Sequence, residues 1–239
     1  MPVVTAASRG QMNEDESEKS FVQRFQAMKH WRLGLISAFT IIAGALAYFI
    51  LSSLDSTQPY EGTEMSGEAP DFRLTDQNSS VINLSDFRGK VVILTFMDSK
   101  CQDTCPLTAA QLREAYRQFD RNESNQVAFI GINVNSEANT IADVYENTKT
   151  WRLEEIPSWH FLTGSRQDLE TIWRDYGIAV VPNPDGNEIM HTPGVFIIDP
   201  SGQKRWYVST VISGAGNTEL TLPLSDLLLK HIREILREN

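Results

Sequence analysis

Cysteine and positive charge are both scarce in this chain, and each scarcity limits what the protein can do. Only two cysteines occur among 239 residues, too few for a structural zinc site built on four of them. Lys and Arg number 21 against 31 Asp and Glu, so the formal net charge is −10. A nucleic-acid surface needs a basic stripe that replaces the counterions of the phosphates. We therefore expect no nucleic-acid partner.

One stretch of the chain lacks charge altogether. Residues 33–54 read LGLISAFTIIAGALAYFILSSL. As a helix this run would span about 33 Å, enough for a bilayer core of about 30 Å. A buried core helix is the alternative, but such a helix seldom lacks a polar face. The length of the run and of the leader before it favours a retained anchor over a cleaved signal peptide.

The charges on either side of this run predict its orientation. Basic residues precede it and acidic residues follow it: Lys19, Arg24, Lys29 and Arg32 before, and Asp55, Glu61, Glu64 and Glu68 after. Positive charge stays in the cytoplasm. We expect a single-pass protein of the cell inner (cytoplasmic) membrane, with residues 1–32 as a cytoplasmic tail, 33–54 as the anchor and a periplasmic or extracellular C-terminal part. That side is oxidising, where cysteines are normally paired or reactive.

The exported part alternates apolar runs with helical patterns. Residues 55–69 are polar and predict a flexible tether, and a folded domain is expected over 70–239. The expected strands are 91–96, 127–134, 159–162, 195–198 and 204–208, the expected helices are 106–121, 139–151, 165–176 and 222–236, and residues 177–190 read as a loop. This order predicts an α/β fold, a central mixed sheet with helices on both faces. The cysteines fall where the first long strand leads into a helix, the thioredoxin-like arrangement.

Both cysteines, Cys101 and Cys105, stand in the segment DSKCQDTCPLT. Proline favours the first helical position and disfavours the α region for the residue before it. Cys105 is therefore expected to be extended, just ahead of a helix that begins at Pro106. The helix dipole and the neighbouring Lys100 would favour thiolates.

Four interpretations of this thiol pair are open. A structural disulfide over so short a loop would contribute only about 2 kcal/mol. A peroxidatic cysteine usually follows a proline and a threonine that are absent here, and a dithiol reductase usually has Cys-x-x-Cys. The fourth interpretation is a copper site, because two thiolates are soft ligands that favour Cu(I), which accepts two or three donors.

Such a site needs at most one histidine from elsewhere in the chain, and four histidines are available. His30 lies on the cytoplasmic side of the expected span, and His231 falls within the apolar stripe of the last helix. His160 begins a short strand and is a weak candidate. His191 is the favoured ligand, because it ends the proline-rich loop before an apolar strand. In a thioredoxin-like fold, the loop before that strand lies against the active-site thiols.

These residues resemble the Sco/SenC family of copper-binding assembly factors for cytochrome c oxidase. The matching pieces are the anchor, APDFRLTDQNSSVINLSDFRGKVVILTF, CQDTCP, FLTGSRQDLETIWRDYGI and HTPGVFIIDPSG. The similarity covers about residues 67–239, nearly all of the exported part. The resemblance implies a thioredoxin-like domain, of the peroxiredoxin-like variant, that binds one copper ion, Cu(I) or Cu(II), through Cys101, Cys105 and His191. It also implies the copper-site subunit of the oxidase as partner, with other copper chaperones or thiol reductases.

The sequence departs from the family pattern in two places. Many members carry an acidic residue just before the histidine, where this chain has Met190, a weak thioether candidate. Pro193 aligns with the cis-proline of thioredoxin-like reductases, which gives the site some reductase character. Asp98 and Asp103 flank the thiols and read as solvated loop acids.

The sequence therefore predicts a membrane-anchored copper chaperone with a thioredoxin fold. Cys101 and Cys105 also form a redox-active pair, because a disulfide between them would abolish the copper site. The alternative is an enzyme, a metal-free thiol-disulfide oxidoreductase that reduces the cysteines of a partner protein. A tethered interaction module fits least well, because its thiols would be incidental.

Overall fold

The computed structural model describes residues 39–49, 61–182, 189–209 and 222–238. It divides the chain into two units, Met1–Gln58 and Pro59–Asn239. In the first unit the described residues, 39–49, form a helix with exposed side chains. Within the described ranges no helix is long and apolar enough to cross a bilayer. The two ends of the expected span, 33–38 and 50–54, lie outside those ranges.

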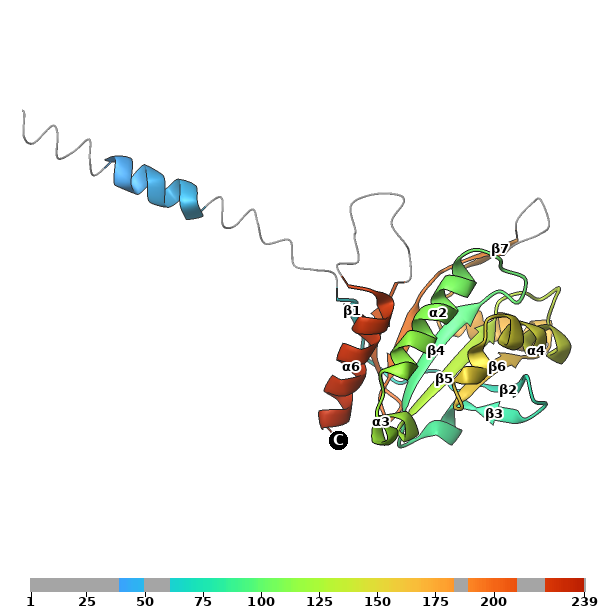
Figure 1. The fold of residues 1–239 in the computed structure, drawn as a ribbon. Coiled ribbons are helices and arrows are strands. Elements are labelled where there is room, and N and C mark those ends of the chain that lie inside the picture. The colour runs from blue at the N-terminus through green and yellow to red at the C-terminus, as the bar shows by residue number, and fades with distance from the viewer. Residues whose placement is uncertain (1–38, 50–60, 183–188, 210–221, 239) are drawn as a thin grey trace, which may run out of the picture. The chain divides into compact units, whose positions relative to one another are not determined.

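The second unit is built on an eight-stranded mixed sheet (Figure 1). Its strands are β1 (Thr63–Glu64), β2 (Arg73–Asp76), β3 (Val81–Asn83), β4 (Val91–Met97), β5 (Val127–Asn133), β6 (Trp159–Thr163), β9 (Val195–Ile198) and β10 (Lys204–Val208). They lie in the order β1-β10-β9-β4-β5-β6-β2-β3. Strands β4, β5 and β6 run parallel at the centre, and the remaining neighbours pair antiparallel. The expected mixed sheet is confirmed.

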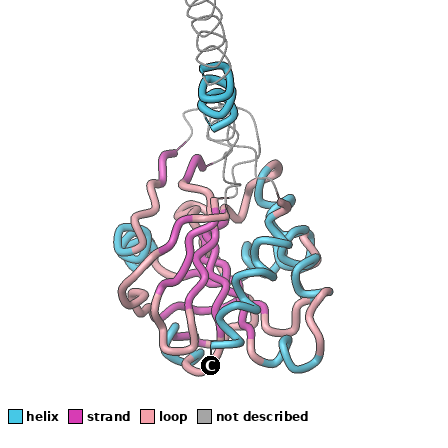
Figure 2. Tube along the Cα trace, turned by 90° about the vertical axis from the view of Figure 1, so that its left-hand side faces the viewer, coloured by secondary structure: helices cyan, strands magenta, loops and turns pink. Residues whose placement is uncertain are grey.

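Helices cover both faces of this sheet (Figure 2). They are α2 (Thr104–Arg117), α3 (Arg121–Asn125), α4 (Ile141–Thr150), α5 (Arg166–Asp175) and α6 (Leu224–Glu238), with short 3-10 turns at Leu84–Phe87 and Leu153–Glu155. Alternate residues of a strand point to opposite faces. Along β4, Val91 and Ile93 therefore join the core under α2, α4 and α6, whereas Val92 and Leu94 join the core under α5. Burial on both faces explains why β4 is apolar at every position except Thr95, without alternation.

The segment expected to be a free tether is partly built into the domain. Strand β1 pairs with β10, and the amide N–H of Ala69 donates to the carbonyl of Gly202 at 2.9 Å. The carbonyl of Glu61 accepts from Nε2 of His231 on α6 at 2.6 Å. The expected boundary near Pro70 is thus wrong for residues 61–69, which belong to the folded unit; residues 55–60 lie outside the described ranges.

The stretch expected to be a loop, 177–190, contains two short strands. Strand β7 (Val180–Pro182) pairs antiparallel with β8 (Ile189–His191) in a separate two-stranded sheet. The sequence predicted a proline-rich loop here. Proline is tolerated where its missing N–H is not needed by a neighbour, as at the edge of a sheet. The pairing brings His191 into a strand, opposite Val180.

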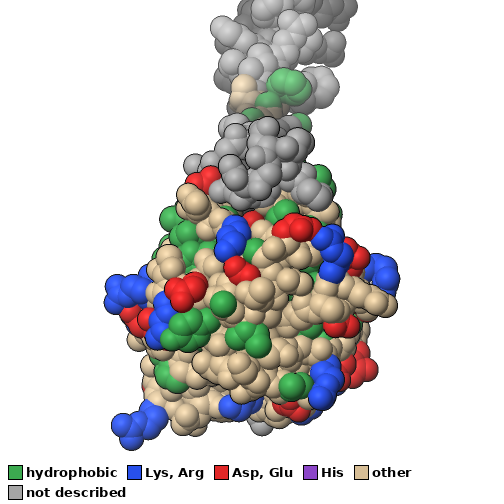
Figure 3. Space-filling view, turned by 90° about the vertical axis from the view of Figure 1, so that its right-hand side faces the viewer, with side chains coloured by type: hydrophobic (Ala, Val, Ile, Leu, Met, Phe, Trp, Pro, Cys, Tyr) green, Lys and Arg blue, Asp and Glu red, His purple; other side chains and the backbone are tan. Residues whose placement is uncertain are grey.

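The described surface carries charges of both signs side by side. In the view of Figure 3, Lys and Arg side chains alternate with Asp and Glu. Several of them form exposed ion pairs, such as Arg88 with Glu68 at 2.7 Å and Arg117 with Glu155 at 2.9 Å. Exposed pairs of this kind contribute at most about 1 kcal/mol each.

Candidate functional site

The thiol loop, residues 98–105, joins the end of β4 to the start of α2. The helix begins at Thr104 with Asp103 as its N-cap, so Cys105 already lies in the first turn. The expectation of an extended Cys105 before the helix is therefore wrong. The first N–H groups of a helix have no partner within the helix, so Pro106 can stand in this turn without losing a hydrogen bond.

The two sulfur atoms of the loop share a hydrogen bond. Cys105 donates to Cys101 through its thiol, and its backbone N–H also donates to Cys101 Sγ at 3.3 Å. The hydroxyl of Thr104 lies 3.7 Å from the same sulfur. The donated hydrogen bonds, chiefly that of the Cys105 thiol, lower the pKa of Cys101 from 9.0 to about 5. Cys101 is therefore a thiolate at neutral pH.

Cys105 has the opposite character. The bond to Cys101 and then burial raise the pKa of the Cys105 thiol well above its ordinary value. Its side chain is buried, whereas that of Cys101 is half-buried. Lys100, expected to favour thiolates, instead pairs with Asp143 at 2.7 Å. The loop thus presents one accessible thiolate backed by one buried, protonated thiol.

A buried polar network holds the loop from behind. Asn133, at the end of β5, accepts from the backbone N–H of Ser99 at 3.2 Å through Oδ1 and donates to the carbonyl of Ala138 at 2.8 Å. The Ser99 hydroxyl donates to the same carbonyl at 2.7 Å. Both side chains are at most 1% exposed. Satisfied buried networks of this kind fix one conformation, so the thiol loop rests on a rigid support.

The two acids of the loop differ in their surroundings. Asp103 is exposed, as expected. Asp98 is only 1% exposed, so its interpretation as a solvated acid is wrong. Its carboxylate accepts three hydrogen bonds: from the backbone N–H of Lys100 at 2.8 Å, from Asn135 Nδ2 at 2.8 Å and from the backbone N–H of Ile189 at 3.1 Å. The cost of burying it is met by these donors.

The bond to Ile189 connects β8, and so His191, to the thiol loop. His191 is half-buried, and its Nδ1 lies 3.1 Å from the carbonyl of Thr192. Because a carbonyl can only accept, Nδ1 carries the proton, which leaves the lone pair on Nε2. Metal-binding histidines usually have one ring nitrogen held in this way. In the described part of the chain, however, no three Cys, His, Asp or Glu side chains form a group ready to hold a metal ion.

The remaining residues that the sequence raised as candidates for the site are two histidines, Met190 and Pro193, and the histidines have partners within the fold. Nδ1 of His160 donates to the carboxylate of the buried Asp76 at 3.0 Å, and His231 stacks on Trp206 with ring centroids 4.0 Å apart. Met190 is 60% exposed on β8. Every peptide bond of the described residues is trans, so Pro193 does not have the cis geometry expected from the alignment.

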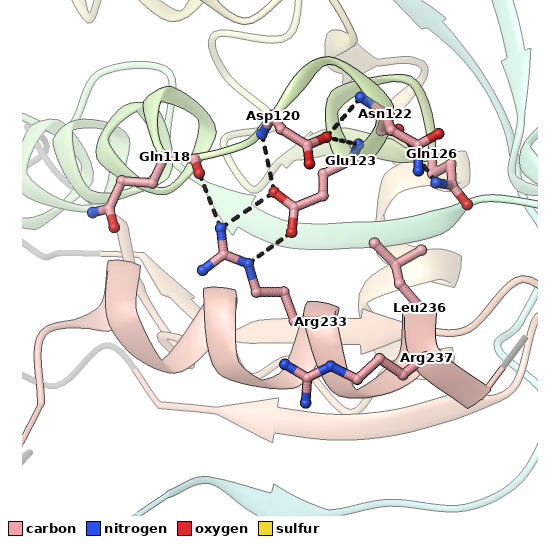
Figure 4. A pocket seen from close by; sticks show the side chains of 8 residues that line it. All are labelled: Gln118, Asp120, Asn122, Glu123, Gln126, Arg233, Leu236 and Arg237. Carbon is pink, nitrogen blue, oxygen red and sulfur yellow. Dashed lines mark hydrogen bonds and ion pairs between the residues drawn. The ribbon is translucent and has the colours of Figure 1, made fainter.

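A hollow of about 460 Å³ lies away from the thiols. Figure 4 shows its lining: Gln118, Asp120, Asn122, Glu123, Gln126, Arg233, Leu236 and Arg237. Arg233 donates to Glu123 at 2.7 Å and to the carbonyl of Gln118 at 3.0 Å, which joins α6 to the end of α2. Because Cys105 is at the start of the 14-residue α2, about 20 Å of helix separates it from this hollow. The hollow is therefore distinct from the thiol site.

Comparison with known proteins identifies the family. The SCO1/SenC family model matches residues 61–217, which is well over half of the chain. The chain belongs to the SCO1/SenC family. Among its SCO1/SenC relatives, the SCO1 protein homolog of Bacillus subtilis is 23% identical over 162 residues, covering 67% of this chain and 81% of that protein.

Two solved SCO1/SenC structures share the fold. Arabidopsis thaliana ScoI with copper bound has a TM-score of 0.59 and 21% identity, and the match covers 72% of this chain and all of that one. The second is BsSco, a member of the Sco family of cytochrome c oxidase assembly proteins in which a disulfide switch has been identified. Its TM-score is 0.55 and its identity 18%, and the match covers 74% of this chain and 98% of that one. These likenesses show the thioredoxin-like fold.

Sequence reasoning found both thiols but missed their support. Asp98, Asn133 and Asn135 each stand at or just beyond the end of a buried central strand. The ends of neighbouring parallel strands meet at one edge of the sheet. Polar residues directly after two such strands were therefore a signal, available in the sequence, that a polar network lies there.

Proposed function

We propose that this chain is a membrane-anchored copper-binding protein that takes part in assembling the dinuclear copper site of cytochrome c oxidase. The observation that carries the proposal is the position of the two cysteines: Cys105 stands in the first turn of α2, and its backbone N–H donates to Cys101 Sγ at 3.3 Å. Two soft donors that already lie together suit Cu(I). Membership of the SCO1/SenC family and the copper bound to the Arabidopsis relative support the same choice of metal.

Three side chains would hold the ion: Cys101, Cys105 and His191. The Cys101 sulfur is accessible and already ionised at neutral pH. Cys105 has to lose its proton when the metal binds, which couples binding to proton release. His191 would offer Nε2, and β8 has to bring this nitrogen to the sulfurs. Copper is the cargo here, and the three donors bind it and release it to an acceptor site.

The redox state of the thiols would control this site. In a disulfide neither sulfur is a thiolate, so oxidation of the pair removes two of the three donors. The disulfide switch described for BsSco is in keeping with such control. We expect the oxidised chain to release copper and the reduced chain to take it up again.

The remaining parts of the proposal concern place and partners. The uncharged run 33–54 would anchor the chain in the cytoplasmic membrane, with the folded unit on the periplasmic or extracellular side. The acceptor would be the copper-site subunit of the oxidase. Copper and reducing equivalents would come from other copper chaperones or thiol reductases on the same side.

Copper titration of the purified full chain, solubilised in detergent, tests the proposal. We expect one Cu(I) per reduced chain, and near-complete loss of binding after Cys101→Ser or Cys105→Ser, because a hydroxyl is a hard ligand. His191→Ala should leave a weaker site formed by the two sulfurs alone, while His160→Ala, the control, should bind as the wild type does. Copper bound equally well by the disulfide form would refute the proposal.

A second function has its own support. An accessible thiolate in front of a buried thiol is also the arrangement of a thiol-disulfide oxidoreductase. The Cys101 thiolate would attack a partner disulfide and release one partner thiolate. Cys105, once deprotonated, would then attack Cys101 Sγ and release the second, so two electrons pass from this pair to the partner. Reduction of a protein disulfide by a chain that binds no Cu(I) would favour this function over the first.

A further inference from the structure

Asp98 is a buried acid whose role the proposed copper site does not explain. Its side chain is 1% exposed and lies one residue beyond β4, three residues before Cys101. Lys100, the nearest cation along the chain, pairs with Asp143 instead. A carboxylate in such a place is costly unless N–H groups satisfy both of its oxygens.

The donors to this carboxylate come from three separate segments. Oδ1 accepts from the Lys100 backbone N–H in the thiol loop and from Asn135 Nδ2 in the loop after β5, both at 2.8 Å. Oδ2 accepts from the Ile189 backbone N–H in β8 at 3.1 Å. The main-chain carbonyl of Asp98 also accepts from the Cys101 N–H at 3.1 Å. One residue thus joins the first thiol, its supporting loop and the strand that ends in His191.

The β7–β8 pair needs such a connection. It forms its own two-stranded sheet, apart from the eight-stranded one. An isolated pair of strands is marginally stable in water. Ile189 and His191 are two residues apart in β8, so their side chains point to the same face and their Cα atoms lie about 7 Å apart. A bond that fixes the backbone at Ile189 therefore also limits where the imidazole can go.

We propose that Asp98 is a positioning residue: by accepting the Ile189 N–H it anchors β8, the strand that ends in the third copper ligand His191, to the loop that bears Cys101 and Cys105. This role rests on the copper site proposed above. The bond is to the backbone, so it is independent of the side chain at position 189. Together with the other two donors, this bond requires two acceptor oxygens, which a carboxylate group provides and an amide does not.

Asp98→Asn is the selective variant. Its carbonyl oxygen can keep the Lys100 and Asn135 donors, but its NH₂ group faces the Ile189 N–H and cannot accept from it. Asp103→Asn is the matched control, since it makes the same change of charge at an exposed position in the same loop. Thermal unfolding of both variants shows whether the fold is retained.

The first measurement needs no metal. Amide hydrogen exchange is followed by NMR on the full chain in micelles, and we expect exchange at Ile189 to be at least tenfold faster in Asp98→Asn and unchanged in Asp103→Asn. Unchanged protection of the Ile189 N–H in Asp98→Asn would show that Asp98 does not hold β8, and would refute the proposal directly. A wild-type chain that is folded but binds no copper would overturn the proposed function. The exchange result would still decide whether the Ile189 N–H is held by Asp98.

The second measurement asks whether Asp98 acts through His191. We expect Asp98→Asn to weaken Cu(I) binding about tenfold, which is about 1.4 kcal/mol, and to weaken the imidazole nitrogen coupling in the EPR spectrum of the Cu(II) form. In a His191→Ala background the same change should cost less than twofold. An equal loss in both backgrounds would show that Asp98 acts on the thiols or the fold alone, and the proposal would fall.

A second variant covers the case in which Asp98→Asn does not fold. Ile189→Pro removes the donor and leaves the carboxylate in place, and proline is tolerated in edge strands. We expect the same loss of copper affinity and the same change in the EPR spectrum. Wild-type values for both would overturn the proposal.

Discussion

The ionisation of Cys101 gives the sharpest test of the site. Its pKa is lowered from 9.0 to about 5, chiefly by the hydrogen bond from the Cys105 thiol. At pH 7 about 99% of the Cys101 side chains would be thiolate, against about 1% for an ordinary cysteine. A thiolate of lower pKa is also a weaker nucleophile: with a Brønsted coefficient of about 0.4–0.5, lowering the pKa by about four reduces its reactivity about 40- to 100-fold. The larger thiolate fraction and the lower nucleophilicity nearly cancel in the alkylation rate at pH 7. The test therefore rests on the pH at which the alkylation rate is half of its maximum.

The assay is alkylation of the reduced, metal-free full chain by iodoacetamide between pH 4 and 10, followed by mass spectrometry. One cysteine should react, with a rate that is level above pH 6 and falls about tenfold between pH 7 and pH 4. The sign follows from the lowered pKa, since the thiolate is lost only as the pH falls through about 5. Cys105 should remain unmodified, because it is buried and its pKa is raised.

Two variants separate the causes of the shift. Cys105→Ala removes the principal donor and should move the midpoint upward toward the ordinary value. Thr104→Ala removes the smallest of the named contributions and should move it less. A wild-type midpoint near 9, or equal alkylation of both cysteines, would refute the asymmetry of the pair.

Three further outcomes are expected. Binding of Cu(I) at pH 7 should release about one proton per chain, because only the Cys105 thiol still carries one. Calorimetry in buffers of different ionisation enthalpy measures this number, and a value of about two would show that both thiols were protonated. Asn133→Ala should lower the free energy of unfolding by about 3 kcal/mol in urea, because it leaves several buried backbone groups without partners; a loss no larger than at an exposed asparagine would contradict the network. Gly194→Ala should destabilise the chain by about 1–3 kcal/mol, because its Cβ would lie 2.3 Å from the Tyr207 ring; the loss should shrink in a Tyr207→Ala background, and an unchanged loss would show that the clash is not the cause.

The elements with strong local patterns could be predicted from the sequence. The run Val91–Met97 is apolar except at Thr95 because it is buried on both faces, and composition alone indicates such a strand. Helix α5 begins after Ser165, whose hydroxyl accepts from the backbone N–H of Asp168, and a serine directly before a helix is a local sequence signal. These signals are local, so a single sequence contains them.

The features that were missed depend on residues far apart in the chain. Asp98 looks like an ordinary loop acid until Asn135 and Ile189, which are 37 and 91 positions away, supply its donors. Strand β7 contains a proline and is too short for a periodic pattern, so only its pairing with β8 reveals it. Likewise, α2 begins at Thr104, two residues before Pro106, and the backbone N–H of Cys105 in its first turn donates to Cys101 Sγ, a contact that the sequence does not show.

The fastening of Glu61 to α6 also has a mechanical consequence. His231 and Lys230 hold this residue at 2.6 Å each, and Arg233, one turn away, is bonded to the end of α2. Tension applied to the chain ahead of Glu61 would therefore be carried into the last helix and on to the helix that bears Cys105. It would not first peel away a loose terminal strand. A recombinant protein that begins at Pro70 would lack this connection. The imidazole of His231 would then lose the Glu61 carbonyl that it now contacts.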